Sequence, residues 1–114
     1  MSEIDWSTPF TPECLHLGRP FLVECQDKNG YTEIFEVLKE IGAEFAECWY
    51  KDGVVSPTPY DEYHSCLRFS RSGRLEKRGY REDYNGYTDH LRFTFYPEMF
   101  TMPDIDISGS PTLL

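Results

Sequence analysis

Apolar side chains between residues 32 and 46 recur every three or four positions, which is the period of an amphipathic α-helix. Thr32 precedes this run and suits the N-cap position, where a side-chain oxygen accepts a backbone N–H. Glutamates fall on another face of the same helix, so one stripe should pack on a sheet while the acidic stripe faces water. The apolar stripe comprises Ile34, Leu38, Ile41 and Phe45, and the acidic stripe Glu33, Glu36, Glu40 and Glu44.

Strand patterns lie on both sides of this helix. The apolar run at residues 21–25 fits a buried strand, and residues 90–96 alternate between apolar and polar side chains. One helix and several strands joined by short turns predict an α+β fold, with a mostly antiparallel β-sheet and one main α-helix packed on one face. The remaining predicted strands are 47–51, 54–55, 65–70 and 74–80, and the predicted turns are 26–30, Asp52-Gly53 and Ser72-Gly73.

The length of 114 residues indicates a single domain with flanking segments. Prolines and a glycine are frequent in residues 1–20, which predicts an extended N-terminal arm and not a helix. The α+β domain is expected to span residues 21–97. Residues 98–114 follow Pro97 as a C-terminal tail, which we expect to be mobile.

The chain is strongly acidic, with a formal net charge of −9 and a pI of about 4.7. Phosphate backbones and anionic membranes repel such a protein on average, so we expect a basic protein or enzyme as its partner. No secretory signal and no apolar run of membrane-spanning length is visible, which predicts a cytoplasmic protein without membrane contact. The four cysteines are then expected to be reduced thiols, mostly buried.

Positive charge is concentrated in residues 68–81, where six cations stand against one carboxylate. In one interpretation these side chains pair with carboxylates across the sheet, as surface charges commonly do. In the other they bind an anion, because the planar fork of arginine suits phosphate and carboxylate groups. The candidate anion-binding residues are Arg68, Arg71, Arg74, Lys77 and Arg78.

Tyrosines and carboxylates occur together in two predicted loops. The rings would cover the edge of the sheet, or they would form a protein-binding surface, because tyrosine offers a large contact area at a small entropic cost. Carboxylates beside the rings would attract a basic partner. Together with Glu36, Glu40 and Glu44 of the helix, the candidate partner-binding residues are Tyr60, Asp61, Glu62, Tyr63, Glu82, Asp83, Tyr84, Tyr87 and Asp89.

Two short Cys/His pairs, in residues 14–16 and 64–66, are the remaining candidates for chemistry. On adjacent strands, the side chains of Cys14, His16, His64 and Cys66 would point the same way and could hold a tetrahedral Zn²⁺. Their spacing is not that of the usual zinc-binding motifs, so buried thiols and surface histidines are the favoured interpretation. We therefore expect no metal, no cofactor and no catalytic residue; a thiol nucleophile would need a depressed pKa.

Residues 21–53 combine a predicted strand, a helix whose end carries Leu38, Ile41 and Gly42, and an aromatic strand with Trp49 that closes at Gly53. This arrangement resembles a βαβ-like unit in small phage-encoded proteins. Small acidic proteins of this size also resemble anti-defence inhibitors and toxin-immunity proteins. The resemblance implies an inhibitor acting in the cytoplasm of a host cell, and it transfers no functional residue.

The leading hypothesis is a non-enzymatic protein-binding module that inhibits a basic nucleic-acid- or nucleotide-handling enzyme through acidic and tyrosine-rich surfaces. A nucleic-acid-binding module that uses the basic hairpin at 68–81 is the first alternative. A small metal-dependent or thiol enzyme is the second, and a purely structural or oligomeric role remains compatible with the sequence. The oligomeric state and the order of the strands are open at this point.

Overall fold

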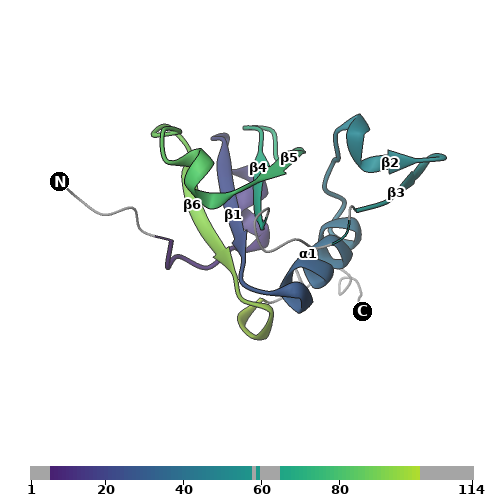
Figure 1. Ribbon diagram of the computed structural model, residues 1–114, viewed down its shortest axis with the longest axis horizontal. Coiled ribbons are helices and arrows are strands. Elements are labelled where there is room, and N and C mark those ends of the chain that lie inside the picture. The colour runs from purple at the N-terminus through teal and green to yellow at the C-terminus, as the bar shows by residue number, and fades with distance from the viewer. Residues whose placement is uncertain (1–5, 58, 60–64, 101–114) are drawn as a thin grey trace, which may run out of the picture.

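The computed structural model describes residues 6–57, 59 and 65–100. A four-stranded sheet with the order β5-β4-β1-β6 forms its centre, and Figure 1 shows these strands side by side. β1 pairs antiparallel with β4 and parallel with β6, and β4 pairs antiparallel with β5. The strands are β1 (Phe21–Cys25), β4 (Cys66–Phe69), β5 (Leu75–Gly79) and β6 (Leu91–Phe95).

The predicted fold class is confirmed, because one main helix, α1 (Lys28–Glu40), packs on one face of a mostly antiparallel sheet. The side of the sheet that α1 covers is called the helix side below, and the opposite side the outer face. Strand alternation sends Phe21, Val23 and Cys25 of β1 to the helix side, and Leu22 to a separate buried cluster on the outer face.

The boundaries predicted for the helix were wrong at both ends. α1 begins at Lys28, four residues before Thr32, so residues 28–30 of the predicted turn belong to its first turn. Asp27 is the N-cap, since its side-chain Oδ1 accepts the backbone N–H of Gly30 at 2.8 Å. Asparagine and glycine at positions 29 and 30 weaken a helical pattern in the sequence, but this cap and the packing of Tyr31 outweigh them.

Gly42 explains why α1 stops at Glu40. Its φ is +79°, in the left-handed region that glycine adopts without strain. The N–H of Ala43 donates to the carbonyl of Leu38, and the N–H of Gly42 donates to that of Lys39. These two bonds form a Schellman motif, so Gly42 terminates the helix and does not weaken its last turn.

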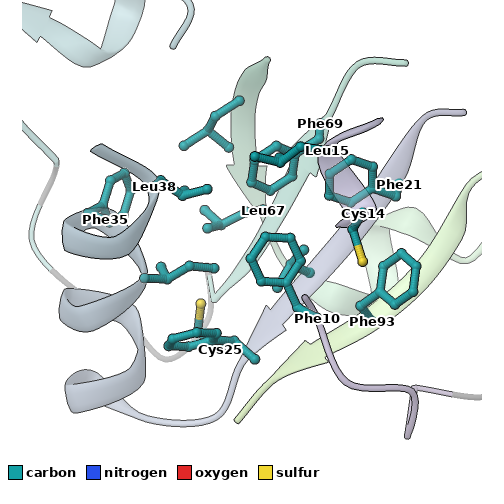
Figure 2. Packing of buried hydrophobic residues seen from close by; sticks show 14 of the residues in the cluster. Phe10, Cys14, Leu15, Phe21, Cys25, Phe35, Leu38, Leu67, Phe69 and Phe93 are labelled. Carbon is teal, nitrogen blue, oxygen red and sulfur yellow. The ribbon is translucent and has the colours of Figure 1, made fainter. Parts of the chain in front are cut away.

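The helix-side core is mainly aromatic (Figure 2). Phe21 and Phe69 stack across the β1–β4 pair with ring centroids 4.5 Å apart. The ring centroid of Phe35 on α1 lies 5.2 Å from that of Trp49. Both members of each pair are buried. Aromatic pairs of this kind contribute roughly 0.5–1.5 kcal/mol beyond the area they bury.

The prediction of an extended arm at residues 1–20 was wrong for the described residues 6–20. Phe10 is 1% exposed, and Cys14 and Leu15 of the 3-10 helix η1 (Pro12–His16) are buried in the same core. Around Pro9, the backbone also pairs parallel with Thr94 of β6. The prolines exclude a long α-helix but permit these two local structures, so this segment belongs to the domain.

Shorter elements complete the described chain. Residues 47–51 were predicted as one strand, but only Tyr50–Lys51 (β2) is a strand, and it pairs with Val54–Val55 (β3) in a hairpin apart from the main sheet (Figure 1). Asp52 and Gly53 have φ values of 55° and 80°, as a type I′ turn requires. The remaining 3-10 helices are η2 (Glu47–Trp49), η4 (Arg81–Tyr84) and η5 (Pro97–Met99). Beyond Phe100, the predicted mobile tail lies outside the described residues.

Replacing Gly42 by alanine should lower the free energy of unfolding by about 1 kcal/mol, because a Cβ is strained at positive φ. Urea unfolding followed by circular dichroism measures the change. Gly86→Ala is the matched control, since Gly86 has no positive φ and no neighbouring atom of the described residues lies within 4 Å of the position that its new Cβ would take. Equal stabilities of the two variants would contradict the role assigned to Gly42.

Candidate functional site

Carboxylates of α1 form an acidic surface on the helix side. Glu36 and Glu40 are exposed on the helix, and Glu44 is exposed four residues after its end. Lys39 partly offsets this charge, because its Nζ lies 3.5 Å from Oε2 of Glu36. An exposed pair of this kind contributes little to stability, so these carboxylates remain available to a partner.

The acidic surface continues into an open pocket at the start of α1, with a volume of about 450 Å³. Asp27, Glu33 and Glu98 contribute carboxylates to its lining, and Phe95 and Pro97 contribute apolar atoms. The sequence does not predict this pocket, because Asp27 falls in a predicted turn and Glu98 in the predicted tail. No local pattern indicates that η5 folds back beside the helix.

The loop of residues 80–89 follows β5, and η4 within it lies in front of the sheet in Figure 1, while η1 lies behind it. Glu82, Asp83 and Asp89 are exposed as predicted, and Tyr87 is 37% exposed. Asp89 Oδ1 lies 2.9 Å from Nδ1 of His90, and this hydrogen bond lowers the pKa of the carboxyl. The acidic residues of the loop therefore face solvent.

Tyr84 is the exception in this loop, because it is 4% exposed and packs on the outer face with Leu22 and Cys66. Its hydroxyl would lie 2.8 Å from a Cβ at position 79, so Gly79 is needed there for steric reasons. Burial raises the pKa of Tyr84 to about 12. The prediction that Tyr84 belongs to an exposed partner-binding surface was therefore wrong.

The structure does not bring the predicted partner-binding residues together. Those of α1 lie on the helix side, whereas the loop of residues 80–89 packs on the outer face through Tyr84. A single flat partner cannot cover both surfaces, because the sheet separates them. The other members of the set, Tyr60, Asp61, Glu62 and Tyr63, lie outside the described residues.

The basic hairpin formed by β4 and β5 is also divided. Arg74 forms an ion pair with Glu76, whose Oε2 lies 2.8 Å from its Nε. Arg78 turns to the helix side, where its Nη1 donates to the hydroxyl of Tyr31 at 3.2 Å and to the carbonyl of Pro59 at 2.9 Å. Arg71 is exposed in the hairpin turn. The hairpin alone therefore does not present its five predicted cations on one surface.

Charged side chains instead meet on the outer face. Arg92 of β6 donates to the carbonyls of His90 and Tyr84, at 3.1 and 2.7 Å, and so fastens the loop to the sheet. The guanidinium carbons of Arg81 and Arg92 each lie 5.5 Å from the ring centroid of Trp6. The alternation of residues 90–96 had placed Arg92 on this face, but no signal in the sequence indicates that Trp6 reaches it.

Glu24 is the half-buried carboxylate of the outer face. Its Oε2 accepts a hydrogen bond from the hydroxyl of Ser65 at 2.8 Å, while its Oε1 is buried without a hydrogen-bond partner among the described residues. Burial raises the pKa of this carboxyl, the bond from Ser65 and the charge of Arg81 lower it, and the charge of Glu82 raises it. The net shift is upward, so the ionised form is costly at this position.

The four Cys/His candidates do not form a site. Cys14 is buried in the helix-side core and Cys66 in the outer-face cluster, on opposite sides of the sheet. His16 is exposed, and His64 lies outside the described residues. Within residues 6–57, 59 and 65–100, no group of three potential ligands is close enough to hold a metal ion. Burial raises the pKa of the Cys66 thiol, which opposes its use as a nucleophile.

Comparison of the chain with protein-family models, with curated proteins and with solved structures finds no match. None of the helices in the described part of the chain has the length and apolar character needed to cross a membrane.

Replacing Glu24 by glutamine should increase the free energy of unfolding at pH 7. Because the folded state raises the pKa of this carboxyl above its ordinary value of 4.5, the ionised form destabilises the fold, and this cost disappears as the pH falls through the folded pKa. The difference between variant and wild type should accordingly shrink toward zero below pH 4.5. Urea unfolding across this pH range measures it.

Glu82→Gln is the control for this experiment, since Glu82 is exposed on η4. Its effect should be small at every pH. A Glu24→Gln variant that is less stable than the wild type at pH 7 would contradict the raised pKa of Glu24. A gain in stability that persists at low pH would contradict it as well.

Proposed function

We propose that this protein is a non-enzymatic protein-binding module that docks the acidic surface of its helix side onto a basic partner. The observation that carries the proposal is the series of exposed carboxylates that continues from α1 into the acidic pocket. Lys39 offsets this series only in part, and Arg68, Arg81 and Arg92 belong to the outer face. A net charge of −9 strengthens the attraction of a basic partner at a distance.

The pocket at the start of α1 provides a specific anchor for such a partner. Its volume of about 450 Å³ is in the range of sites that accept one large side chain or a small ligand. The stem of a lysine or arginine would lie on Phe95 and Pro97, and its charged head would reach Glu33 and Glu98. Asp27 also lines the pocket, but its Oδ1 already caps the helix.

Proteins that handle nucleic acids or nucleotides are the partner class we propose, because they present cationic clefts to phosphate groups. Carboxylates on a rigid helix can occupy such a cleft in place of phosphates. Docking of this kind would inhibit the partner in the cytoplasm, as expected for small anti-defence proteins. The hypothesis from the sequence combined the acidic helix residues with the tyrosine-containing loops, whereas the contact proposed here uses the helix side alone.

A charge-reversal variant tests this proposal. Three baits are used in extracts of the native host, and bound proteins are identified by mass spectrometry. They are the wild-type protein, the triple variant Glu33→Lys/Glu36→Lys/Glu40→Lys and the double variant Glu82→Lys/Asp83→Lys. The first variant should lose the captured partner, with affinity reduced by at least about 100-fold once the partner is purified, because like charges oppose each other at the interface. The second variant, altered on the outer side, should retain the partner.

Both variants should fold, because all five positions are exposed. Circular dichroism checks that they do. Undiminished capture by the helix variant would contradict the proposal. Capture lost only in the Glu82/Asp83 variant would place the interface on the loop instead.

A further inference from the structure

Both asparagines of the chain, Asn29 and Asn85, are followed by glycine. In this dipeptide the backbone nitrogen of the glycine can attack the side-chain amide of the asparagine, because glycine has no side chain to hinder ring closure. Both asparagines are exposed and both have a helical backbone conformation. Any difference in their reactivity must therefore come from what holds each dipeptide in the folded protein.

The start of α1 protects Asn29. The nitrogen that would react belongs to Gly30, which is buried and donates its N–H to Asp27 Oδ1 at 2.8 Å. A Cβ at position 30 would lie 3.9 Å from atoms of both Phe95 and Pro97, so the backbone is closely packed here. Ring closure requires ψ of the asparagine to leave the helical region. At this position the rotation would break the helix cap and unpack the first turn.

Asn85 meets far less resistance to the same rotation. It follows η4 with φ −60° and ψ −29°, and both it and Gly86 are exposed. In the described part of the chain, no hydrogen bond holds the N–H of Gly86, and no atom lies within 4 Å of a Cβ built there. The turn around this dipeptide is closed by the bond from the N–H of Tyr87 to the carbonyl of Tyr84, at 3.0 Å. Exposed turns of this kind open more readily than a packed helix.

We propose that Asn85 is a site of deamidation, at which the folded protein converts a side-chain amide into a carboxylate. The nitrogen of Gly86 loses its proton and bonds to Cγ of Asn85, the bond from Cγ to the amide nitrogen breaks, and ammonia leaves with the proton. Water then opens the resulting succinimide at either carbonyl, which leaves an aspartate or a β-linked isoaspartate. Water is the co-reactant, and nothing is oxidised or reduced.

The β-linked product lengthens the backbone between Tyr84 and Tyr87, whose ring centroids lie 5.0 Å apart. Tyr84 is anchored, since its ring is buried and its carbonyl accepts from Arg92 Nη2 at 2.7 Å. Tyr87 is held less firmly, because it is 37% exposed and lies against the guanidinium of Arg68, 5.8 Å from its ring centroid. An additional backbone atom breaks the turn that joins the two tyrosines. The modification thus adds a negative charge to the loop and frees Tyr87 from the outer face, independently of the helix-side interface.

Peptide mass spectrometry tests the proposal, because trypsin releases the two asparagines on separate peptides, residues 29–39 and 82–92. The folded protein is incubated at mildly alkaline pH in water enriched in ¹⁸O and is then digested in ordinary water. Label in the side chain therefore records deamidation during the incubation alone. The peptide 82–92 should acquire it, as two products separable by chromatography, at least about tenfold faster than the peptide 29–39, since the loop opens more readily than the helix.

Unfolding and two variants provide the controls. In concentrated urea the two rates should become similar, because neither dipeptide is then held by the fold. Gly86→Ala should suppress the reaction at Asn85, since a methyl group hinders ring closure, and the fold should persist because the added Cβ meets open space among the described residues. Asp27→Ala removes the helix cap, so it should accelerate the reaction at Asn29 and leave that at Asn85 unchanged.

Hydrogen exchange of the purified isoaspartate product tests the effect on the loop. In the ¹⁵N-labelled protein, the amide hydrogen of Tyr87 should exchange faster than in the unmodified form, because its bond to the carbonyl of Tyr84 is lost. The amide hydrogen of Ala46, which donates to the carbonyl of Leu75 at 2.9 Å far from the loop in sequence, should exchange at its original rate.

Equal rates at the two asparagines of the folded protein would overturn the proposal, as would an Asn85 that stays intact in the folded state. A rate difference that persists in urea would assign the effect to neighbouring residues in the sequence and not to the fold. An unchanged exchange rate of the Tyr87 amide in the isoaspartate product would overturn the release of Tyr87.

Discussion

The alternation of side chains along β1 is the constraint on which the rest of the structure depends. β1 lies between β4 and β6, so its register sets which residues of both neighbours share a face. Phe21 and Val23 face α1, and Leu22 and Glu24 face the opposite way. A slip of one residue would exchange the two sets, moving a carboxylate into an aromatic core at a prohibitive cost. The register is therefore strongly specified.

The arginines of this acidic chain are accommodated on both faces of the sheet. Few of them are neutralised by simple ion pairs among the described residues, and several are stacked on rings or bound to backbone carbonyls. Arg78 lies 5.6 Å from the ring centroid of Tyr31, and Arg92 fastens two carbonyls of the loop to the sheet. Such contacts use arginine as a packing residue as much as a charge. They leave the exposed carboxylates of α1 as the dominant charge of the helix side.

Much of the sheet could be predicted from the sequence, because period-two patterns and Asp-Gly or Ser-Gly turns act locally. The prediction for 21–25 coincides with β1, and those for 65–70, 74–80 and 90–96 each contain one observed strand. Features that depend on distant contacts could not be predicted. Asp27 caps a helix that the apolar stripe places later, and Phe10 is buried because β6 returns beside it. Likewise, the burial of Tyr84 requires Gly79 beneath the ring.

The pairing of the first described residues with the last strand has a consequence for the order in which the protein folds. The N–H of Phe10 donates to the carbonyl of Thr94, and β1 takes β6 as its parallel neighbour. During synthesis, β1 therefore leaves the ribosome long before one of its two neighbours exists, and the ring of Phe10 has no complete core to enter. Contacts between such distant positions slow folding. Until β6 emerges, the nascent chain must keep an aromatic surface and an unpaired strand edge from aggregating, which makes that interval its most vulnerable stage.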